Sequence, residues 1–531
     1  MLDVSAMAGE LSVASVSVRE QRRGAALVRI WVPYLLVAFG ALLYLRPFTR
    51  ALWYNMDEGI VLDGAQRVTE GQLPGRDFLE GMGPGGFYWL AGFFHLFGTS
   101  VATANGLLLA TGVAVALAMF HLARRVDAHA VLCAGLFVVT AIAAFPIHNH
   151  HLDSDLFCLL ALCAFVEWQR GGNVLLLAGC GTLAAAATLT YQSEGPLFLT
   201  ALVLSVLLVS RTAGKRAVTP LLGLICPYLV LLAGVGAFYF SRGALHDLVW
   251  ANFIWPASRA LGTSNCPYAM FLGHNLGAIR GGLAPTVPGF LSLIVAAFVS
   301  LPLLLAVAMP VLLTGLAVRL RALAFTSDLI PFWCGGIALW LSESERPDMV
   351  HLIFGSAILL ILMSALLRRI TTHQGIALLC TASLLVFASI YLFQALDARV
   401  SIETRSGQLF GQSQDQALQF LLRNTHSGDY VFIYPYSPQY YFLSDTRNPT
   451  RLSHYVYGWN PPEQFREAVD RLEAKRVRFV LWDPGVDHLL HIVLPHYKTA
   501  PANEQIIEPY LESHYHQLGS AGGFRIMARN P

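Results

Sequence analysis

Long apolar runs separated by short polar loops dominate most of the chain. The first run covers residues 27–45, and ten more follow before residue 396, several near the ~20 residues that a helix needs to cross a bilayer. They lie near residues 101–123, 131–147, 156–168, 174–190, 196–209, 221–240, 288–318, 324–341, 349–367 and 375–396. This pattern predicts a polytopic α-helical membrane protein with about eleven transmembrane helices.

The run at residues 288–318 is longer than one span and contains Pro302 and Pro310. Proline removes a backbone donor and kinks or breaks a helix. The segment is therefore either one kinked helix or a helix with a partial re-entrant piece.

Basic side chains gather in alternate loops between the predicted spans. They are Arg19, Arg22, Arg23, Arg124, Arg125, Arg170, Arg211, Lys215, Arg216, Arg319, Arg321, Arg368 and Arg369. Positively charged loops stay on the cytoplasmic side of a membrane. We therefore expect residues 1–26 to form a cytoplasmic N-terminal segment and residues 27–396 to form the transmembrane domain. An odd number of spans then places the C-terminus on the external face.

The pattern changes after residue 396. Strand-like runs at 430–436, 478–482 and 524–529 alternate with amphipathic helical patterns at 413–424, 462–475 and 503–514. Alternating helices and strands predict a small α/β domain, and a segment of this length can hold its own core. Residues 397–531 are thus expected to form a soluble domain on the external side.

Composition supports the membrane class and excludes others. Hydrophobic residues make up 55% of the chain and charged residues only 13%, whereas globular proteins average about 25% charged residues. The net charge is +2, and no dense basic stripe with interleaved aromatics occurs, so nucleic-acid binding is not expected. Of the eight cysteines, only Cys266 lies in a loop, so no disulfide framework is expected.

The first external loop, residues 47–100, carries charge beside a membrane span, where it is costly unless it has a use. Asp57 and Glu58 begin a predicted helix that Gly71 ends. Its apolar residues recur at helical spacing, and they are Ile60, Val61, Ala65 and Val68. Asn55 and Glu58 have capping-box spacing. Asp57 points in another direction, and the helix dipole stabilises its negative charge, which suits a general base or a cation ligand.

The rest of this loop places polar and apolar groups side by side. Arg76 and Glu80 precede a glycine-rich run at residues 81–86. Residues 87–97, which include Tyr88, form an aromatic-rich helical pattern typical of a membrane surface. An amphiphilic substrate would find both kinds of contact here, so Glu80 and Tyr88 are candidate substrate-binding residues.

A second group of polar residues covers residues 148–155. Asp153 and Asp155 could hold a divalent cation through carboxylate oxygens, although a third ligand is not evident. Two other interpretations remain open. The segment is a hydrated turn in which Asp153 caps the next span, or its side chains bind sugar hydroxyls.

A third group lies before the tenth span. Arg346 offers a guanidinium that can bind phosphate oxygens in a bidentate manner, and His351 adds a second donor. Asp348 is a candidate for substrate binding, as is Glu194, which interrupts two apolar runs. The alternatives are an Arg–Asp pair that only closes a helix end and a plain turn at Glu194.

The first loop also contains a recognisable set of motifs. They are Asp57-Glu58-Gly59 with Ala65, Gly71 with Pro74 and Arg76-Asp77-Phe78, and Gly83-Pro84 with Phe87-Tyr88. The loop resembles that of the membrane-embedded GT-C glycosyltransferases, especially the bacterial group similar to protein O-mannosyltransferases and to the aminoarabinose transferase of lipid A. Arg124-Arg125, Asp153 to Asp155 and the Arg-Pro-Asp-x-x-His at residues 346–351 fit the same resemblance.

The resemblance implies a function and a location. It implies an inverting glycosyltransferase of the bacterial inner membrane that takes a sugar from a polyprenyl-phosphate donor, with Asp57 as catalytic base and Glu58 beside it. The acceptor would be a periplasmic glycolipid, glycan or protein. Several relatives carry Lys-Pro where this chain has Gly83-Pro84, so a lysine able to contact the donor phosphate is missing. Arg346, His351 and Arg76 are the candidates to replace it.

Two other functions compete with this one. A lipid-linked polymer ligase of the O-antigen type is also polytopic, but an acidic and aromatic first loop is unexpected for it. A lipid or sugar transporter or flippase would show repeat-related helices and polar residues near the bilayer midplane. The apolar runs here are clean and the charge gathers at one surface, which favours the enzyme. No cofactor is certain, and a divalent metal ion is possible.

Overall fold

The structure is a computed structural model that describes residues 29–51, 53, 56–214, 216–260, 265–283 and 289–531. Five residues named above lie outside the described ones: Arg19, Arg22, Arg23, Asn55 and Lys215.

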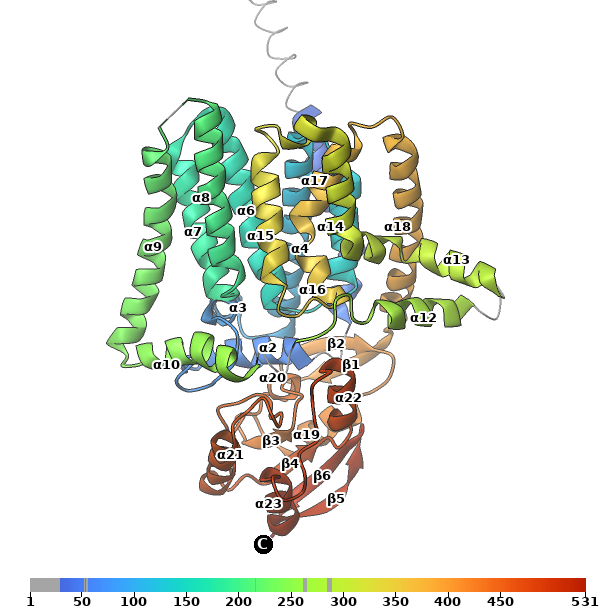
Figure 1. Cartoon of the computed structure of the whole chain (residues 1–531). Helices are drawn as coiled ribbons and strands as arrows, with labels where there is room; N and C mark the ends of the chain where they lie inside the picture. Colours follow the sequence, from blue (N-terminus) through green and yellow to red (C-terminus); the bar gives the residue numbers. More distant parts are fainter. Residues whose placement is uncertain (1–28, 52, 54–55, 215, 261–264, 284–288) are drawn as a thin grey trace, which may run out of the picture.

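A bundle of roughly parallel helices forms one body, and a smaller domain hangs from one end of it (Figure 1). Among the described residues, the helices long and apolar enough to cross a membrane are five: α4 (Val101–Arg125), α8 (Glu194–Thr212), α9 (Val218–Ser241), α14 (Leu301–Leu320) and α18 (His373–Leu396). The shorter apolar helices include Arg29–Leu45, α7 (Val174–Thr190), α15 (Ile330–Ser342) and α17 (Ala357–Leu367). The prediction of a polytopic helical membrane protein is confirmed, and the count of eleven spans stays a prediction.

The distribution of apolar side chains fits this class. Nearly every residue of α17 is buried, so this helix forms the centre of the bundle. Outer helices present large apolar side chains instead, with 70% of Val230 and 72% of Leu378 exposed. Water-soluble monomers rarely expose such broad apolar surface. The exposed faces of these outer helices are therefore suited to contact with lipid tails.

Two of the predicted long runs are divided. The run at residues 288–318 breaks at Ser300 into α13 (Phe290–Val299) and α14, while α12 (Leu272–Leu283) packs on α13 beside the bundle (Figure 1). The break precedes Pro302, which lies in the first turn of α14, where a missing backbone N–H costs nothing. The run at residues 349–367 likewise divides into α16 (Met349–Phe354) and α17. The interpretation of residues 288–318 as one kinked helix is therefore wrong. This segment forms the short helix α13 followed by the long helix α14.

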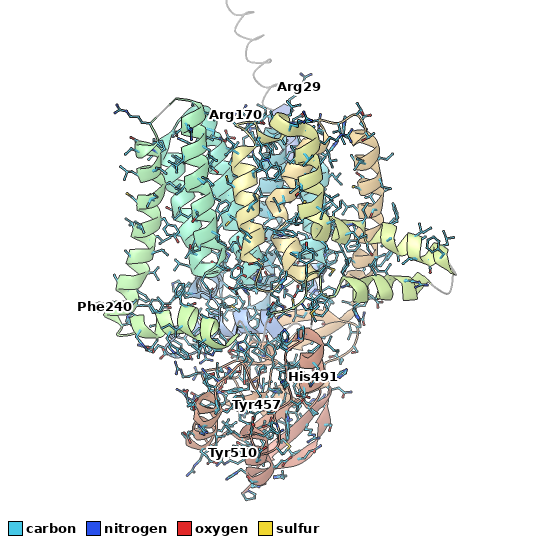
Figure 2. All side chains as sticks on the ribbon, viewed as in Figure 1. Arg29, Arg170, Phe240, Tyr457, His491 and Tyr510 are labelled. Atoms are coloured by element: carbon cyan, nitrogen blue, oxygen red, sulfur yellow. The ribbon has the colours of Figure 1, made fainter. Side chains whose placement is uncertain are left out.

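The end of the bundle that carries residues 397–531 is called the domain face below. Arg29 and Arg170 lie at the opposite end, whereas Tyr457, His491 and Tyr510 lie in the attached domain (Figure 2). The first loop folds at the domain face, as η1 (Phe48–Arg50), α2 (Met56–Thr69) and α3 (Pro84–Phe97). Gly71 has a positive φ of 85° and follows α2, as the sequence predicts.

The C-terminal domain is built on a small mixed sheet. Its strand order is β3-β4-β6-β5, in which β3 and β4 are parallel and the other pairs antiparallel. The strands are β3 (Val431–Tyr434), β4 (Phe479–Trp482), β5 (Tyr515–Ala521) and β6 (Phe524–Arg529), and a separate hairpin joins β1 (Val400–Thr404) to β2 (Gly407–Gly411). The helices are α19 (Gln416–Asn424), α20 (Gln439–Ser444), α21 (Pro462–Ala474), α22 (Val486–Val493) and α23 (Ile507–His514). The three predicted strands are present. The mostly exposed β5 carries no apolar alternation that could have revealed it.

Helix α2 lies flat between the bundle and this domain (Figure 1). Its apolar residues Val61, Leu62 and Ala65 share one hydrophobic cluster with α20 and the sheet. The helices approach so closely that a Cβ at Gly59 would lie 2.3 Å from the backbone nitrogen of Gln439. Only glycine permits this approach. The first loop and the C-terminal domain are thus packed as one unit.

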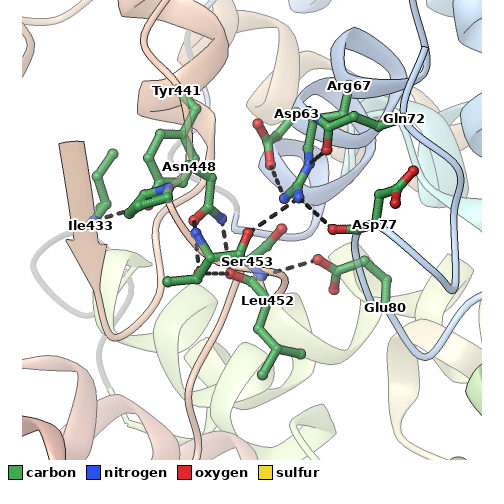
Figure 3. Close-up of polar contacts among 12 residues, drawn as sticks. Asp63, Arg67, Gln72, Asp77, Glu80, Ile433, Tyr441, Asn448, Leu452 and Ser453 are labelled. Carbon is green, nitrogen blue, oxygen red and sulfur yellow. Dashed lines mark hydrogen bonds and ion pairs between the residues drawn. The ribbon is translucent and has the colours of Figure 1, made fainter. Parts of the chain in front are cut away.

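Arg67 links the parts of this unit, as Figure 3 shows. Its side chain is 8% exposed and lies 3.7 Å from the carboxylate of Asp63. It donates to Gln72 Oε1 (2.9 Å), to the carbonyl of Asp77 in the first loop (3.1 Å) and to the carbonyl of Thr450 in the C-terminal domain (3.2 Å). One buried guanidinium on α2 therefore binds two backbone carbonyls, one in the first loop and one in the C-terminal domain.

We predict that Arg67→Met loosens the C-terminal domain from α2. Removing one partner from a buried ion pair costs about 3–5 kcal/mol, because the other charge and its acceptors stay buried. The melting temperature in detergent should fall, and protease cleavage within residues 446–454 should become faster. Arg466→Met removes an exposed ion pair with Glu463 and is the matched control, expected to change neither. Equal behaviour of the two variants would contradict the role given to Arg67.

Candidate active site

Asp57 lies in the first turn of α2, and its side chain is exposed at the domain face. The hydroxyl of Tyr436 donates a hydrogen bond of 2.7 Å to Asp57 Oδ1. Tyr436 follows β3, so this contact joins the first loop to the C-terminal domain. Burial and then the Asp57 carboxylate raise the pKa of Tyr436 well above its ordinary value, so the phenol keeps the proton that it donates.

Glu58 points away from Asp57, as their adjacent helix positions predict. Its Oε1 accepts a hydrogen bond of 3.4 Å from the backbone nitrogen of His148. Burial raises the pKa of Glu58 to about 8, and the His148 amide opposes this only partly. The imidazole of His148 lies 2.8 Å from the carbonyl of Ala104, and burial lowers its pKa to about 4. Glu58 thus holds the segment before α6 (His150–Gly171) and differs in environment from Asp57.

The N-terminus of α6 brings histidines to the same place. Asn149 caps this helix by accepting from Leu152 N at 2.8 Å, so the alternative in which Asp153 is the cap is wrong. The ring of His151 lies 4.1 Å from that of His150 and 4.6 Å from that of Tyr191, centroid to centroid. His151 interacts electrostatically with Asp57, Asp348 and His351. These four residues belong to one cluster.

Glu343 faces this cluster from the end of α15. Only 2% of it is exposed, and its Oε1 lies 3.0 Å from His151 Nδ1. The hydroxyl of Tyr191 lies 3.5 Å from the other carboxylate oxygen. Burial raises the pKa of Glu343 to about 8.

Asp348 organises the segment that follows. It caps α16 by accepting from Val350 N and His351 N, and its Oδ1 lies 2.9 Å from His351 Nδ1. Its Oδ2 accepts from Arg346 Nε at 2.8 Å. Burial opposes ionisation, but His351 and Arg346 hold the pKa of Asp348 far below its usual range. The Arg–Asp pair that closes a helix end is therefore real. Arg346 also donates to the carbonyl of Val493 in α22, at 3.0 Å.

Two more acidic residues lie behind Glu343. Asp155 and Glu194 are each 1% exposed, and both interact electrostatically with Glu343. Asp155 Oδ2 and Glu194 Oε1 find no hydrogen-bond partner in the described part of the chain. Asp153 is also buried, but two residues along a helix turn by about 200°, so its side chain leaves α6 in another direction from that of Asp155. Metal binding by this pair stays a prediction.

Other predicted site residues lie elsewhere. Glu80 is buried against the C-terminal domain, where its Oε1 accepts from Ser453 N (3.2 Å) and its Oε2 lies 3.4 Å from His454 Nδ1. Tyr88 packs against Tyr239 in α9. Arg76 pairs with its neighbour Asp77 at 2.8 Å on the surface. Contacts within the described residues thus connect neither Arg76 nor Tyr88 to the cluster around His151.

Arg76 instead lines an open cavity of about 380 Å³ between α2 and the C-terminal domain. Its basic lining residues are Arg67, Arg76, Arg447, Arg471 and Lys475, and its acidic ones are Asp63, Glu70 and Asp77. Burial, and then the neighbouring guanidinium groups, lower the pKa of Lys475 to about 8. Because its lining includes five basic and three acidic side chains, the cavity is more basic than acidic.

The glycine that stands in place of a lysine has a structural reason. A Cβ at Gly83 would lie 2.1 Å from the carbonyl oxygen of Leu189, and one at Gly85 would lie 2.7 Å from the carbonyl carbon of Leu189. The N-terminus of α3 is thus pressed onto the end of α7 with no room for a side chain. A lysine at this position would require the two helices to separate.

Sequence reasoning missed two members of the cluster, Tyr436 and Glu343. Tyr436 belongs to a Tyr-Pro-Tyr sequence after a buried strand, which signals a turn but not a partner for Asp57. Glu343 stands three residues before Arg346, so its position beside a predicted site residue was an available signal.

Comparison with known proteins relates the chain to solved structures only. No family model matches it, and no curated protein matches it. The crystal structure of ArnT from Cupriavidus metallidurans bound to undecaprenyl phosphate superposes with a TM-score of 0.54 and 11% identity, over 95% of this chain and 99% of that chain. The oligosaccharyltransferase of Archaeoglobus fulgidus, in complex with zinc and sulfate, gives 0.46 and 13% identity, over 92% and 73%. ArnT in the apo state gives 0.42 and 12% identity, over 95% and 100%.

The likeness to the ligand-bound ArnT extends over almost the whole of both chains, the C-terminal domain included. At 11% identity it establishes the fold and nothing more, and the two lower scores carry no weight. The chain therefore has the GT-C membrane fold, and the resemblance found in the first loop is confirmed at that level.

We predict that Glu58 makes stability depend on pH. Its folded pKa of about 8 exceeds the ordinary value of 4.5, so the unfolded chain binds fewer protons between these values and stability falls as pH rises through that window. The side chain of Glu58→Gln stays neutral at every pH. The melting temperature of this variant in detergent, relative to that of the wild type, should therefore rise between pH 4.5 and pH 8. Glu463→Gln, at an exposed position, is the control. A constant difference between Glu58→Gln and wild type across this range would refute the assignment.

Proposed function

We propose that this chain is an integral-membrane glycosyltransferase that moves a sugar from a polyprenyl-phosphate donor to an acceptor at the domain face. One observation carries the proposal: the exposed Asp57 is tied by Tyr436 into the same cluster as Arg346, Asp348 and His351. A carboxylate and a phosphate-binding pair are the two parts that such a transfer needs. The likeness in fold to ArnT bound to undecaprenyl phosphate supports the lipid-phosphate donor.

Asp57 acts as the general base in a single inverting displacement. The acceptor hydroxyl oxygen forms a bond to the anomeric carbon while the bond from that carbon to the phosphate oxygen breaks. Asp57 takes the hydroxyl proton, and the electron pair of the broken bond stays on the polyprenyl phosphate. The hydrogen bond from Tyr436 orients the carboxylate during this step.

Arg346 and His351 stabilise the leaving phosphate. Asp348 holds Arg346 through one nitrogen and His351 through Nδ1, so both donors are positioned before the substrate binds. Arg346 supplies the positive charge that a lysine at position 83 cannot, because Leu189 occupies that space. Arg76 is exposed and pairs with Asp77, which argues against a share in this task.

The domain face is on the external side of a bacterial inner membrane in this proposal. The acceptor is a glycolipid, a glycan or a protein reached from that side.

Glu80, buried between the first loop and the C-terminal domain, supports the loop that carries Asp57. A polymer ligase or a transporter would not release sugar from a polyprenyl-phosphate monosaccharide, so one assay with that donor separates the proposed function from both alternatives.

We predict that Asp57→Asn lowers sugar transfer from a labelled polyprenyl-phosphate donor in detergent by about 10²–10⁴-fold, the usual contribution of a general base. Expression and melting temperature should stay at the wild-type values, because Asp57 is exposed. Asp470→Asn, at an exposed position of α21, is the control and should transfer normally. Ordinary turnover by Asp57→Asn would remove this residue from the mechanism.

We predict a smaller loss for Tyr436→Phe. The phenylalanine keeps the ring but removes the donor to Asp57, and a hydrogen bond to a charged group contributes about 1.5–3 kcal/mol, roughly 10–100-fold in rate. The loss should appear in kcat, and the double variant with Asp57→Asn should be no slower than Asp57→Asn alone. Additive losses in the double variant would show that the two residues act independently.

A further inference from the structure

We propose that the open cavity between α2 and the C-terminal domain binds a phosphate group on a hydroxylated carrier, such as a sugar phosphate or the headgroup of phosphatidylglycerol. Its volume of about 380 Å³ falls within the range of small-ligand pockets. None of its lining residues belongs to the cluster around His151. Asp57 and Arg67 lie on the same helix, and their α-carbons are about 15 Å apart along its axis. The cavity is therefore separate from the candidate active site.

Basic side chains reach the cavity from both of the parts that enclose it. Arg67 and Arg76 belong to the first loop, whereas Arg447, Arg471 and Lys475 belong to the C-terminal domain. Like charges that face each other across an interface repel, and this repulsion opposes the docking of the domain. An anion in the cavity would attract both sides and would replace the repulsion by a bridge.

Lys475 is the basic side chain of the lining that lacks an acidic partner. Its ammonium donates to the carbonyl of Pro449 at 2.8 Å and lies 4.1 Å from the centre of the Tyr430 ring. Within the described ranges, no carboxylate forms an ion pair with this ammonium. Burial, and then three neighbouring guanidinium groups, lower its pKa to about 8. A partly buried ammonium that other cations surround is costly, and an anion beside it removes that cost.

The three acidic side chains of the lining do not balance this charge. Each of them pairs with one arginine of the same lining. The pairs are Asp77 with Arg76 at 2.8 Å, Glu70 with Arg447 at 3.4 Å and Asp63 with Arg67 at 3.7 Å. Arg471 is held at 2.8 Å by Glu467, which lies outside the lining. These pairs fix the guanidinium groups in place and leave the charge of Lys475 for a ligand.

The inner wall of the cavity offers both a donor and an acceptor. Arg67 Nη1 and Gln66 Oε1 are buried, and neither finds a hydrogen-bond partner in the described part of the chain. Buried polar atoms without a partner cost free energy, which a ligand that bonds to them recovers. Phosphate oxygens accept hydrogen bonds and hydroxyl groups donate them. A hydroxylated phosphate therefore satisfies both atoms, whereas a bare anion satisfies one.

Occupation of the cavity would tighten the docking of the C-terminal domain on α2. The same docking brings Tyr436 to Asp57. A ligand near the end of α2 would thus help to hold a contact at the start of this helix. Binding itself does not depend on the proposed function, because it involves none of the residues assigned to sugar transfer and is measured without a donor.

The test follows the melting temperature of the full chain in detergent while glucose 6-phosphate is added at constant ionic strength. A ligand that binds only the folded chain stabilises it increasingly above its Kd, so the melting temperature should rise with the logarithm of the concentration. Uncharged glucose should have no effect. Inorganic phosphate should bind about 2–10-fold more weakly, because it lacks the additional hydroxyl donors.

A second arm separates a soluble phosphate from a lipid headgroup. The full chain is placed in nanodiscs of phosphatidylglycerol or of phosphatidylcholine, and the wild type is compared with Lys475→Gln. Stabilisation by phosphatidylglycerol that the variant lacks would assign the cavity to a lipid headgroup. Stabilisation by glucose 6-phosphate in detergent would assign it to a soluble sugar phosphate. Either result supports the proposal, and a chain that responds to neither would overturn it.

Variants locate the bound group. Lys475→Gln and Arg447→Gln should each weaken the binding of glucose 6-phosphate about 10–100-fold, as the loss of a hydrogen bond between charged groups does. Arg466→Gln removes the same charge from an exposed position of α21 outside the lining, and should respond as the wild type does. Arg447 is exposed, so its variant tests the site even if Lys475→Gln does not fold.

Three further outcomes decide the assignment. Stabilisation that is retained in both Lys475→Gln and Arg447→Gln would place the anion elsewhere and overturn the site. Equal affinity for inorganic phosphate and glucose 6-phosphate would show that only charge is recognised, and would overturn the hydroxylated ligand. Binding by a chain that transfers no sugar from a polyprenyl-phosphate donor would support this site and count against the proposed function.

Discussion

The packing of α2 between the helix bundle and the C-terminal domain is the constraint on which the rest of this structure depends. Arg67 is buried among carbonyls from two segments, and Gly59 touches the backbone of Gln439. The C-terminal domain then delivers Tyr436 to Asp57 and the carbonyl of Val493 to Arg346. Without this docking the aspartate would keep its place on the helix but lose the hydrogen bond that orients it.

The bundle supplies the other half of the cluster through the ends of its helices. His151 lies in the first turn of α6, Glu343 follows α15, and Asp348 begins α16. Charged groups are costly inside the hydrocarbon, so a membrane protein can gather them where spans begin and end. Breaks between short helices at the domain face create more such ends than a bundle of uninterrupted spans would. The cluster is a consequence of that arrangement.

Much of the site could be predicted because its chemistry is visible in the residues themselves. Asp57, Arg346 and His351 stand in polar loops beside apolar spans, and in the structure they belong to one cluster. Arg76 and Tyr88 have equally polar sequence neighbours. In the structure, however, Arg76 pairs with Asp77 at the surface and Tyr88 lies against Tyr239. The sequence contains no signal that separates the two cases, because the difference depends on which distant segment each residue faces.

The sequence by itself determined the membrane class, the change of composition near residue 396, the helix that carries Asp57 and three strands of the C-terminal domain. These follow from local patterns, since helices and strands are governed by residues within one or two turns. Only the tertiary structure decided that Tyr436 meets Asp57, that Leu189 excludes a side chain at Gly83, and that Glu343 joins two histidines. Tyr436 and Asp57, Leu189 and Gly83, and Glu343 and His151 each lie more than a hundred positions apart in the sequence. Packing in three dimensions, not local spacing, selects such partners.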